Sequence, residues 1–265
     1  MLELLEQLFR HVRAYLHSER FNRNQVYFSS SQHTIMQFDR EAEDIIISGL
    51  VESGYGFEVI TEERPVFTTS TPPQYRIIVD PIDGSTNVSR GIMTAAVSLA
   101  VLPMDTPIVA EQVQWALVGE LFSGTVYQAQ HGGGAFCNGR RCQVSEIQGL
   151  DECIVGMNLD GRDLYTQLKL LTQHPAIGKI RRTGSSAMDL VYVANGAYDA
   201  YIDIGGIITA ESFLAASSII CEAGGIISDR AGKPLRAVTN LTEGFSLIAA
   251  GTRDLHQQLV SRINS

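Results

Sequence analysis

One stretch decides the fold of this 265-residue chain: Tyr75-Arg76-Ile77-Ile78-Val79-Asp80-Pro81-Ile82-Asp83-Gly84-Ser85-Thr86-Asn87. Its apolar start, bounded by Pro and Gly, predicts a buried strand that stops at Asp80. Asp80 and Asp83 then lie three residues apart on a tight turn, a geometry suited to a metal ion. Pro81 fixes its own φ and biases Asp80 toward the extended region, so the turn is stiff before any ligand binds.

The residues that follow the turn are suited to an anion. Gly84 permits close backbone approach, and the amides of Gly84, Ser85 and Thr86 can open a helix whose N-terminus attracts a phosphate. An Asp-x-x-Asp-Gly sequence by itself is also an ordinary turn. It is not an EF-hand calcium loop, because Gly91 stands at the twelfth position from Asp80 where that loop has Glu.

Further carboxylates lie upstream. Glu62-Glu63 follows the apolar segment 57–60, so this acidic pair is expected at a strand end that faces the same cleft. Asp39 is a candidate for a fourth carboxylate. The other acids of segment 41–44 are expected to form a solvated helix face.

Six segments together resemble the inositol monophosphatase family of magnesium-dependent phosphatases, within the superfamily that includes fructose-1,6-bisphosphatases. A set of six ordered matches is far more specific than any one of them. The segments run in the family's order: Thr61-Glu62-Glu63, Val79 to Asn87, Gly132 to Gly139, Arg182 to Leu190, Ala194 to Tyr201, and Glu222-Ala223-Gly224-Gly225.

Hydrophobic periodicity predicts strands clustered early in the chain and helix/strand alternation later, which indicates a layered α+β fold. Asn138-Gly139 predicts a hairpin turn. The resemblance implies an α-β-α-β-α sandwich with its cleft between two halves of one compact unit, 1–145 with the metal motifs and 146–265 with the substrate-pocket residues. Helices are predicted at 1–17, 34–52, 161–173, from 184 and at 209–223, and strands at 57–60, 75–79, 94–102, 108–117, 124–129, 153–157, 198–202, 226–228 and 246–250.

The resemblance also implies a role for each matching residue. Asp80 would bridge two metal ions, Glu62 and the Ile82 carbonyl would complete the first site, and Asp83 would bind the second ion. Ser85 stands where the family has a threonine that, with Glu62, orients the attacking water. Helix capping is an equal alternative for the side chains of Ser185 and Ser186. Substrate contacts are expected from Asp83, Gly84, Ser85, Thr86, Gly184, Ser185, Ser186 and Asp203.

One segment departs from the family's pattern. The family has Trp-Asp before an apolar helix that ends in Glu-Ala-Gly-Gly, whereas this chain has Glu211-Ser212, so Ser212 falls on an aspartate that binds the second metal ion. Extra residues around Gly205-Gly206 leave the register open, and fructose-1,6-bisphosphatases place a Glu near this point. Glu211 is therefore the candidate for the missing ligand; otherwise the second ion is weakly held.

Composition excludes several classes of protein. A net charge of −9 argues against nucleic-acid or anionic-membrane binding, and no run of eighteen apolar residues could span a bilayer. Segment 1–10 has early acids and helical periodicity instead of a signal peptide, so a cytoplasmic location is expected. The four cysteines lack C-x-x-C spacing, which argues against a disulfide framework or a zinc site. Neither the G-x-S-x-G elbow of serine hydrolases nor the H-E-x-x-H motif of zinc proteases occurs.

The chain is therefore predicted to be a Mg²⁺-dependent phosphomonoesterase that acts on a small phosphorylated polyol or sugar, inositol monophosphate first. Oxygen ligands and a phosphate substrate favour Mg²⁺. Fructose 1,6-bisphosphate and 3′-phosphoadenosine 5′-phosphate are alternative substrates. Ser212 motivates an alternative of another class, a catalytically weak homologue that binds a phosphorylated ligand or a protein partner. A homodimer is expected, because family members commonly are dimers.

Overall fold

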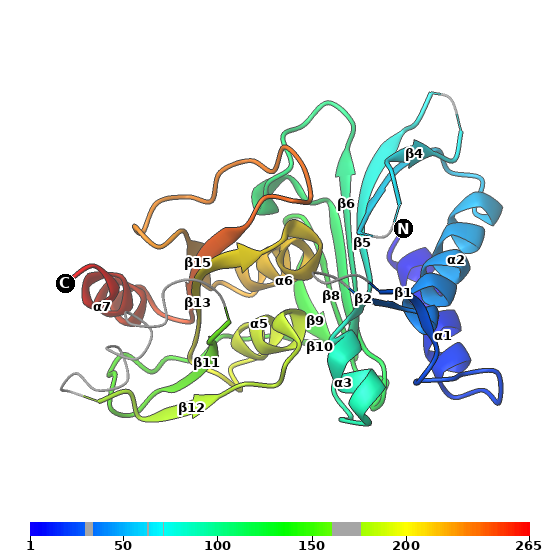
Figure 1. The fold of residues 1–265 in the computed structure, drawn as a ribbon. Coiled ribbons are helices and arrows are strands. Elements are labelled where there is room, and N and C mark those ends of the chain that lie inside the picture. Colours follow the sequence, from blue (N-terminus) through cyan, green and yellow to red (C-terminus); the bar gives the residue numbers. More distant parts are fainter. Residues whose placement is uncertain (30–33, 63, 71, 161–175) are drawn as a thin grey trace.

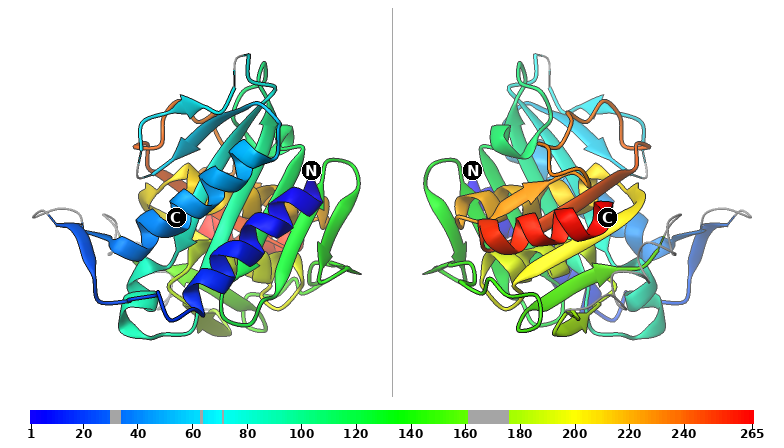
Figure 2. Two further views of the ribbon diagram at one scale, coloured as in Figure 1. Left: turned by 90° about the vertical axis from the view of Figure 1, so that its right-hand side faces the viewer. Right: turned by 90° about the vertical axis from the view of Figure 1, so that its left-hand side faces the viewer.

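A computed structural model describes residues 1–29, 34–62, 64–70, 72–160 and 176–265, and its helices and sheets alternate in layers (Figure 1). Helices α1 (Leu2–Leu16) and α2 (Gln37–Glu52) cover one face of a first sheet. Helices α5 (Ser186–Ala194) and α6 (Ala210–Glu222) lie between this sheet and a second one. Helix α7 (Arg253–Asn264) covers the far face of the second sheet (Figure 2). The predicted α-β-α-β-α sandwich is confirmed.

In the described part of the chain the first sheet has eight strands, in the order β10-β9-β8-β7-β6-β5-β3-β4. Strands β3 and β5 are parallel, and the other neighbours are antiparallel. Both faces of β5 are covered, since Ile78 lies in the cluster around α6 and Ile77 and Val79 lie in the cluster under α1 and α2, which explains its apolar sequence. The strands are β3 (Phe57–Thr61), β4 (Phe67–Thr68), β5 (Tyr75–Asp83), β6 (Ala96–Pro103), β7 (Trp115–Glu120), β8 (Val126–Gln130), β9 (Gly134–Cys137) and β10 (Arg140–Arg141).

The second sheet has five described strands in the order β12-β11-β13-β15-β14. Strands β12, β11 and β13 are parallel, and β15 runs antiparallel to β13 and β14. Every described strand of the first sheet precedes residue 142, and every one of the second follows residue 153, so the predicted division at residue 145 falls between the sheets and stays a prediction. The strands are β11 (Ile154–Asn158), β12 (Lys179–Arg181), β13 (Ala200–Ile208), β14 (Ile226–Ser228) and β15 (Phe245–Ala250).

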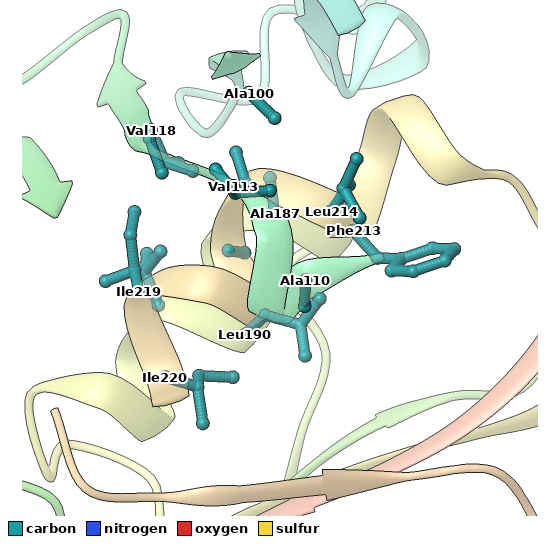
Figure 3. Close-up of a cluster of buried hydrophobic side chains, with 14 of the residues drawn as sticks. Ala100, Ala110, Val113, Val118, Ala187, Leu190, Phe213, Leu214, Ile219 and Ile220 are labelled. Atoms are coloured by element: carbon teal, nitrogen blue, oxygen red, sulfur yellow. The ribbon is translucent and has the colours of Figure 1, made fainter. Parts of the chain in front are cut away.

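The central helical layer fixes the distance between the sheets. Helix α6 is apolar or small around most of its circumference, as expected for a helix that is covered on both sides. Figure 3 shows Phe213, Leu214 and Ile219 of α6 in one cluster with Leu190 of α5 and Val118 of β7. This packing holds α6 against the first sheet and leads its N-terminus to β5.

The predicted end of the central strand at Asp80 is wrong, because β5 continues to Asp83. Asp80 pairs with Ser98 and Asp83 with Ala96, so β5 has one residue more than β6 between these pairs. The turn predicted at Pro81 is thus a bulge within the sheet, the kind of position where a strand tolerates proline.

Segment 108–117, predicted as one strand, is divided in the structure. Ile108 makes an isolated bridge to Val238, a short 3₁₀ helix follows (η1, Ala110–Gln112), and β7 begins only at Trp115. Ile108, Ala110, Val113 and Ala116 of this segment are buried in the cluster around α6, and Figure 3 shows Ala110 and Val113 there. The apolar pattern of the segment therefore reports burial and does not mark one continuous strand.

Other predictions differ at element ends. The helix predicted from residue 34 begins at Gln37, because Asp39 accepts a hydrogen bond from the backbone amide of Met36 at 3.1 Å and fixes the first turn. Helix α7 and the pair β1 (Val26–Ser29) and β2 (Thr34–Met36) were not predicted. The helix predicted at 161–173 lies outside the described residues. Within the described ranges no helix is long and apolar enough to cross a bilayer.

Candidate active site

Both aspartates of the β5 bulge are buried. Asp80 is 4% exposed and Asp83 is 9% exposed. Asp80 Oδ1 accepts a hydrogen bond from the Ile82 amide at 3.1 Å, and Asp80 Oδ2 accepts one from Ser212 Oγ of α6 at 3.1 Å. The bulge is therefore held from within and also from the central helical layer.

Asp83 joins β5 to the start of α5. Its Oδ2 accepts hydrogen bonds from Ser185 Oγ and, at 2.8 Å, from the Ala187 amide. Ser185 Oγ also accepts from the Met188 amide at 3.3 Å and so caps α5. The capping alternative for Ser185 is confirmed, and the same hydroxyl also holds an acidic residue of the site, whereas its contact with a substrate stays a prediction.

Ser85 is the first residue of the short helix α3 (Ser85–Arg90). Its Oγ lies 2.6 Å from Asp39 Oδ1 and 2.9 Å from the Ile82 carbonyl oxygen, and its single proton serves one of them at a time. Asp39 comes from α2 and is 6% exposed. The candidate fourth carboxylate thus reaches the site through Ser85.

The first turn of α6 adds a buried acid. Glu211 is 3% exposed, one carboxylate oxygen accepts from Thr209 Oγ1, and the other, Oε2, is buried with no hydrogen-bond partner among the described residues. Ser98 Oγ of β6 donates to the Glu211 carbonyl at 2.8 Å and fixes this turn against the sheet.

The acidic groups raise one another's pKa. Burial holds the pKa of Asp80 well above its usual range, and the negative charges of Asp83, Glu62 and Glu211 add to the effect. Burial likewise raises the pKa of Asp83 to about 6 and that of Glu211 to about 7. Glu62 is exposed just after β3, close enough for its charge to act on all three. Its neighbour Glu63 lies outside the described residues.

A sequence profile of the inositol monophosphatase family matches residues 2–265. The chain belongs to the inositol monophosphatase family. The predicted resemblance is confirmed, and the chain is placed among the phosphatases of this family.

Individual relatives agree with this assignment. An inositol-1-monophosphatase of Mesorhizobium japonicum is 36% identical over 202 residues, which cover 75% of this chain and 73% of that protein. A fructose-1,6-bisphosphatase/inositol-1-monophosphatase of Thermococcus kodakarensis is 31% identical over 217 residues, 82% of this chain and 78% of that protein. The crystal structure of the extragenic suppressor protein suhB from Bartonella henselae superposes with a TM-score of 0.83 at 27% identity, covering 100% of this chain and 98% of that one. The relatives' names cover both inositol and fructose phosphates, so the family is shown and the substrate is not fixed.

Inositol monophosphatases are metal-dependent in general, and the acidic groups of this chain suit a hard divalent cation. They offer oxygen ligands and oppose one another's ionisation, and Glu211 Oε2 is buried with no hydrogen-bond donor among the residues that the structure describes. Among the described residues no group of three or more His, Cys, Asp or Glu side chains is already arranged to hold an ion. These acidic side chains are chemically suitable ligands for a cation. In this structure they accept hydrogen bonds from the hydroxyl groups of Ser185, Ser212 and Thr209.

The predicted substrate residues lie on three elements. Thr86 is exposed on α3, and Gly184 is exposed before α5 with a φ of +86°. A Cβ on Gly184 would lie 2.9 Å from the side-chain amide of Asn87, so only glycine fits beside α3 there. Ser186 accepts a hydrogen bond from the Tyr201 hydroxyl at 3.3 Å and does not cap the helix.

Asp203 is fully buried on β13, and its partners belong to the second sheet. It accepts hydrogen bonds from Asn158 Nδ2 at 2.9 Å and from the Gly205 amide at 3.2 Å. The extra residues noted around Gly205-Gly206 form an irregularity in the pairing of β13 with β15. The role of Asp203 in substrate binding stays a prediction.

Sequence reasoning missed two residues that shape the site. Asn87 donates through Nδ2 to the carbonyls of Thr94 and Thr183, both at 2.8 Å, and so ties α3 to the loop before α5. Asp189 accepts from the Thr183 amide at 3.3 Å, and burial raises its pKa to about 7. Both residues lie within the matched segments, but no local pattern distinguishes them from ordinary helix residues.

The raised pKa values predict that the metal-free protein is less stable at high pH. A carboxyl group whose pKa is higher in the folded state contributes stability below its unfolded pKa, and this contribution is lost as the pH rises through the folded pKa. For Asp83 and Glu211 that loss extends from about pH 4 to the folded pKa values of about 6 and about 7. Thermal unfolding in EDTA should give a lower Tm at pH 8 than at pH 5.

A divalent cation should raise the Tm more at pH 8 than at pH 5, because it binds the ionised carboxylates. Glu211→Gln removes one of the titrating groups, so the variant should lose less stability than the parent over this range. A Tm that is constant or rises from pH 5 to pH 8 in EDTA would contradict the prediction.

Proposed function

We propose that this protein is a Mg²⁺-dependent phosphomonoesterase that hydrolyses a small phosphorylated polyol or sugar, inositol monophosphate first. The proposal rests on three buried acids, Asp80 and Asp83 of β5 and Glu211 of α6. The charge of Glu62, which follows β3, acts on the same acids. Such crowding of like charges is costly. Two carboxylates about 4 Å apart repel by about 4 kcal/mol at an effective dielectric constant of about 20. A cation-binding role explains why the sequence tolerates it.

We infer the ligands from this chain's own donors. Asp80 would bridge two ions, Glu62 and the Ile82 carbonyl would complete one site, and Asp83 and Glu211 would complete the other. Ser212 donates to Asp80, which supports the prediction that Ser212 occupies the position of the family's aspartate. Binding would draw Glu211 from Thr209 and Asp83 from Ser185.

When bound, the cations neutralise charge on the phosphoryl oxygens and increase the acidity of the attacking water. Ser85 would orient that water through its hydroxyl, and the 2.6 Å contact supports Asp39 as the acceptor of the hydroxyl proton. Attack on phosphorus forms the new P–O bond as the ester P–O bond breaks. The leaving alkoxide takes the proton that the attacking water loses and departs as the alcohol.

Two related substrates and one other class of function are the alternatives. The Thermococcus relative supports fructose 1,6-bisphosphate, whereas 3′-phosphoadenosine 5′-phosphate rests on the wider superfamily alone. A catalytically weak homologue that only binds a phosphorylated ligand is the alternative that Ser212 motivates. Phosphate release should be measured from a panel of phosphorylated polyols, sugars and nucleotides, with and without Mg²⁺. The kcat/KM values distinguish the candidate substrates from one another. No release above background from any member would favour the binding protein.

Asp83 gives the first test of the proposed site. Asp83→Asn should keep the fold and lose at least about 10²-fold in kcat, because a charge that faces the cation is removed while the side-chain volume stays. Asp254→Asn on α7 is a matched control that removes an exposed acid away from the site and should leave kcat unchanged. Near-normal turnover by a folded Asp83→Asn protein would remove the proposed mechanism.

Glu211 and Ser212 give the second test. Glu211→Gln should raise the Mg²⁺ concentration for half-maximal activity, because a neutral amide is a poorer ligand for a hard cation. Ser212→Asp should lower it, and Ser212→Ala controls for the lost hydrogen bond to Asp80. If Glu211 is only a first-turn acid, Glu211→Gln will remove about 0.3–1 kcal/mol of helix-dipole stabilisation and so lower the Tm slightly. The dependence of activity on Mg²⁺ will then be unchanged.

A homodimer in the cytoplasm completes the proposal. Closed two-fold assemblies are the commonest oligomers, and the family is commonly dimeric. Sedimentation at micromolar concentration should give twice the chain mass of 29.0 kDa. A single species at the chain mass would refute the dimer and leave the proposed chemistry unaffected.

A further inference from the structure

A cavity of about 850 Å³ lies apart from the carboxylates, between α1 and the β8 to β10 edge of the first sheet. Helix α1 contributes Glu6, Arg10, Arg13 and His17, and the sheet side contributes Gly124, Gln128 and Asn138. Arg10 is paired with Glu6, so Arg13 is the arginine of this lining whose charge is left for a ligand. None of these residues takes part in the site described above.

Arg13 is held in place by a backbone carbonyl, and no described carboxylate pairs with it. Its Nη2 donates to the Phe122 carbonyl at 3.1 Å, and the guanidinium lies against Gly124. A Cβ on Gly124 would lie 3.0 Å from both Cζ and Nε of Arg13, so the glycine makes room for the guanidinium. Within the described ranges Arg13 forms no salt bridge, whereas its neighbour Arg10 pairs with Glu6 at 2.5 Å.

Two polar atoms at this cavity are buried and unpartnered among the described residues. They are Arg13 Nε, which lacks an acceptor, and Gln128 Oε1, which lacks a donor. Buried polar groups in folded proteins are nearly always satisfied by protein, water or ligand. A molecule that carries both anionic oxygens and a hydroxyl group would meet both needs after small side-chain shifts.

We propose that this cavity is a second, non-catalytic binding site for a small phosphate-bearing molecule. Phosphate oxygens accept from the fixed guanidinium in the geometry that arginine favours, and a hydroxyl of the ligand donates to Gln128. The bond to the Phe122 carbonyl already restricts the guanidinium, so the small shift that binding needs costs little further side-chain freedom. The volume admits a phosphorylated sugar or polyol as well as free phosphate.

The probe is inorganic phosphate, titrated by calorimetry into metal-free protein at constant ionic strength. Without a cation the buried carboxylates repel phosphate from the active site, so binding reports the cavity, and the result is independent of whether the protein is a phosphatase. Arg13→Lys keeps the charge but loses the fork of donors. It should weaken phosphate binding by at least about tenfold.

Gly124→Ala and Gly54→Ala form a matched pair. Gly124 and Gly54 have left-handed φ angles of +79° and +75°, so alanine strains the backbone similarly at both positions. A Cβ on Gly124 would meet Arg13, whereas a Cβ on Gly54 would have no described atom within 4 Å. Gly124→Ala should weaken binding by at least about tenfold and Gly54→Ala by less than about twofold. If Gly124→Ala fails to fold, Arg13→Lys decides. Absence of binding by the parent up to about 10 mM phosphate, or equal affinity in all four proteins, would overturn the proposal.

Discussion

The bulge between Asp80 and Asp83 is the constraint on which the rest of the structure depends. It lies inside the first sheet, and both carboxylates are buried where that sheet meets the central helices. Each must therefore be satisfied from another layer, Asp83 by the start of α5 and Asp80 by Ser212 of α6. Because buried polar groups without a partner are costly, these hydrogen bonds align the helical layer with β5.

The same constraint explains the unusual start of α6. Ser212 donates to Asp80, and this neutral hydroxyl donor lowers the electrostatic cost of the cluster. Glu211, one residue earlier, keeps a carboxylate in the layer with one oxygen unpartnered within the described ranges. The first turn of α6 thus brings one carboxylate and one hydroxyl donor to the cluster.

The far end of α6 is held as firmly as its start. The Glu222 carboxylate accepts hydrogen bonds from the Gly132 amide at 2.8 Å and the Gly134 amide at 2.9 Å. The glycine-rich turn between β8 and β9 therefore anchors the end of this helix, and two motifs that lie about ninety residues apart form one contact. Since both ends of α6 are tied to the first sheet, the position of Glu211 beside β5 is determined by the whole helix.

The sequence by itself determined the local features: the apolar run of β5, the Asp-Pro-Ile-Asp-Gly segment, the alternation that indicates layers, and the hairpin turn at Asn138-Gly139. These follow from backbone preferences and from a periodicity that reports burial. Periodicity does not say what covers a residue, which is why segment 108–117 was assigned to a strand. Only the tertiary structure decided that Ser85 meets Asp39, 46 residues away, and that Asp80 meets Ser212, 132 residues away. Such contacts depend on how far apart the layers are held, which is a property of the packed core and of no single segment.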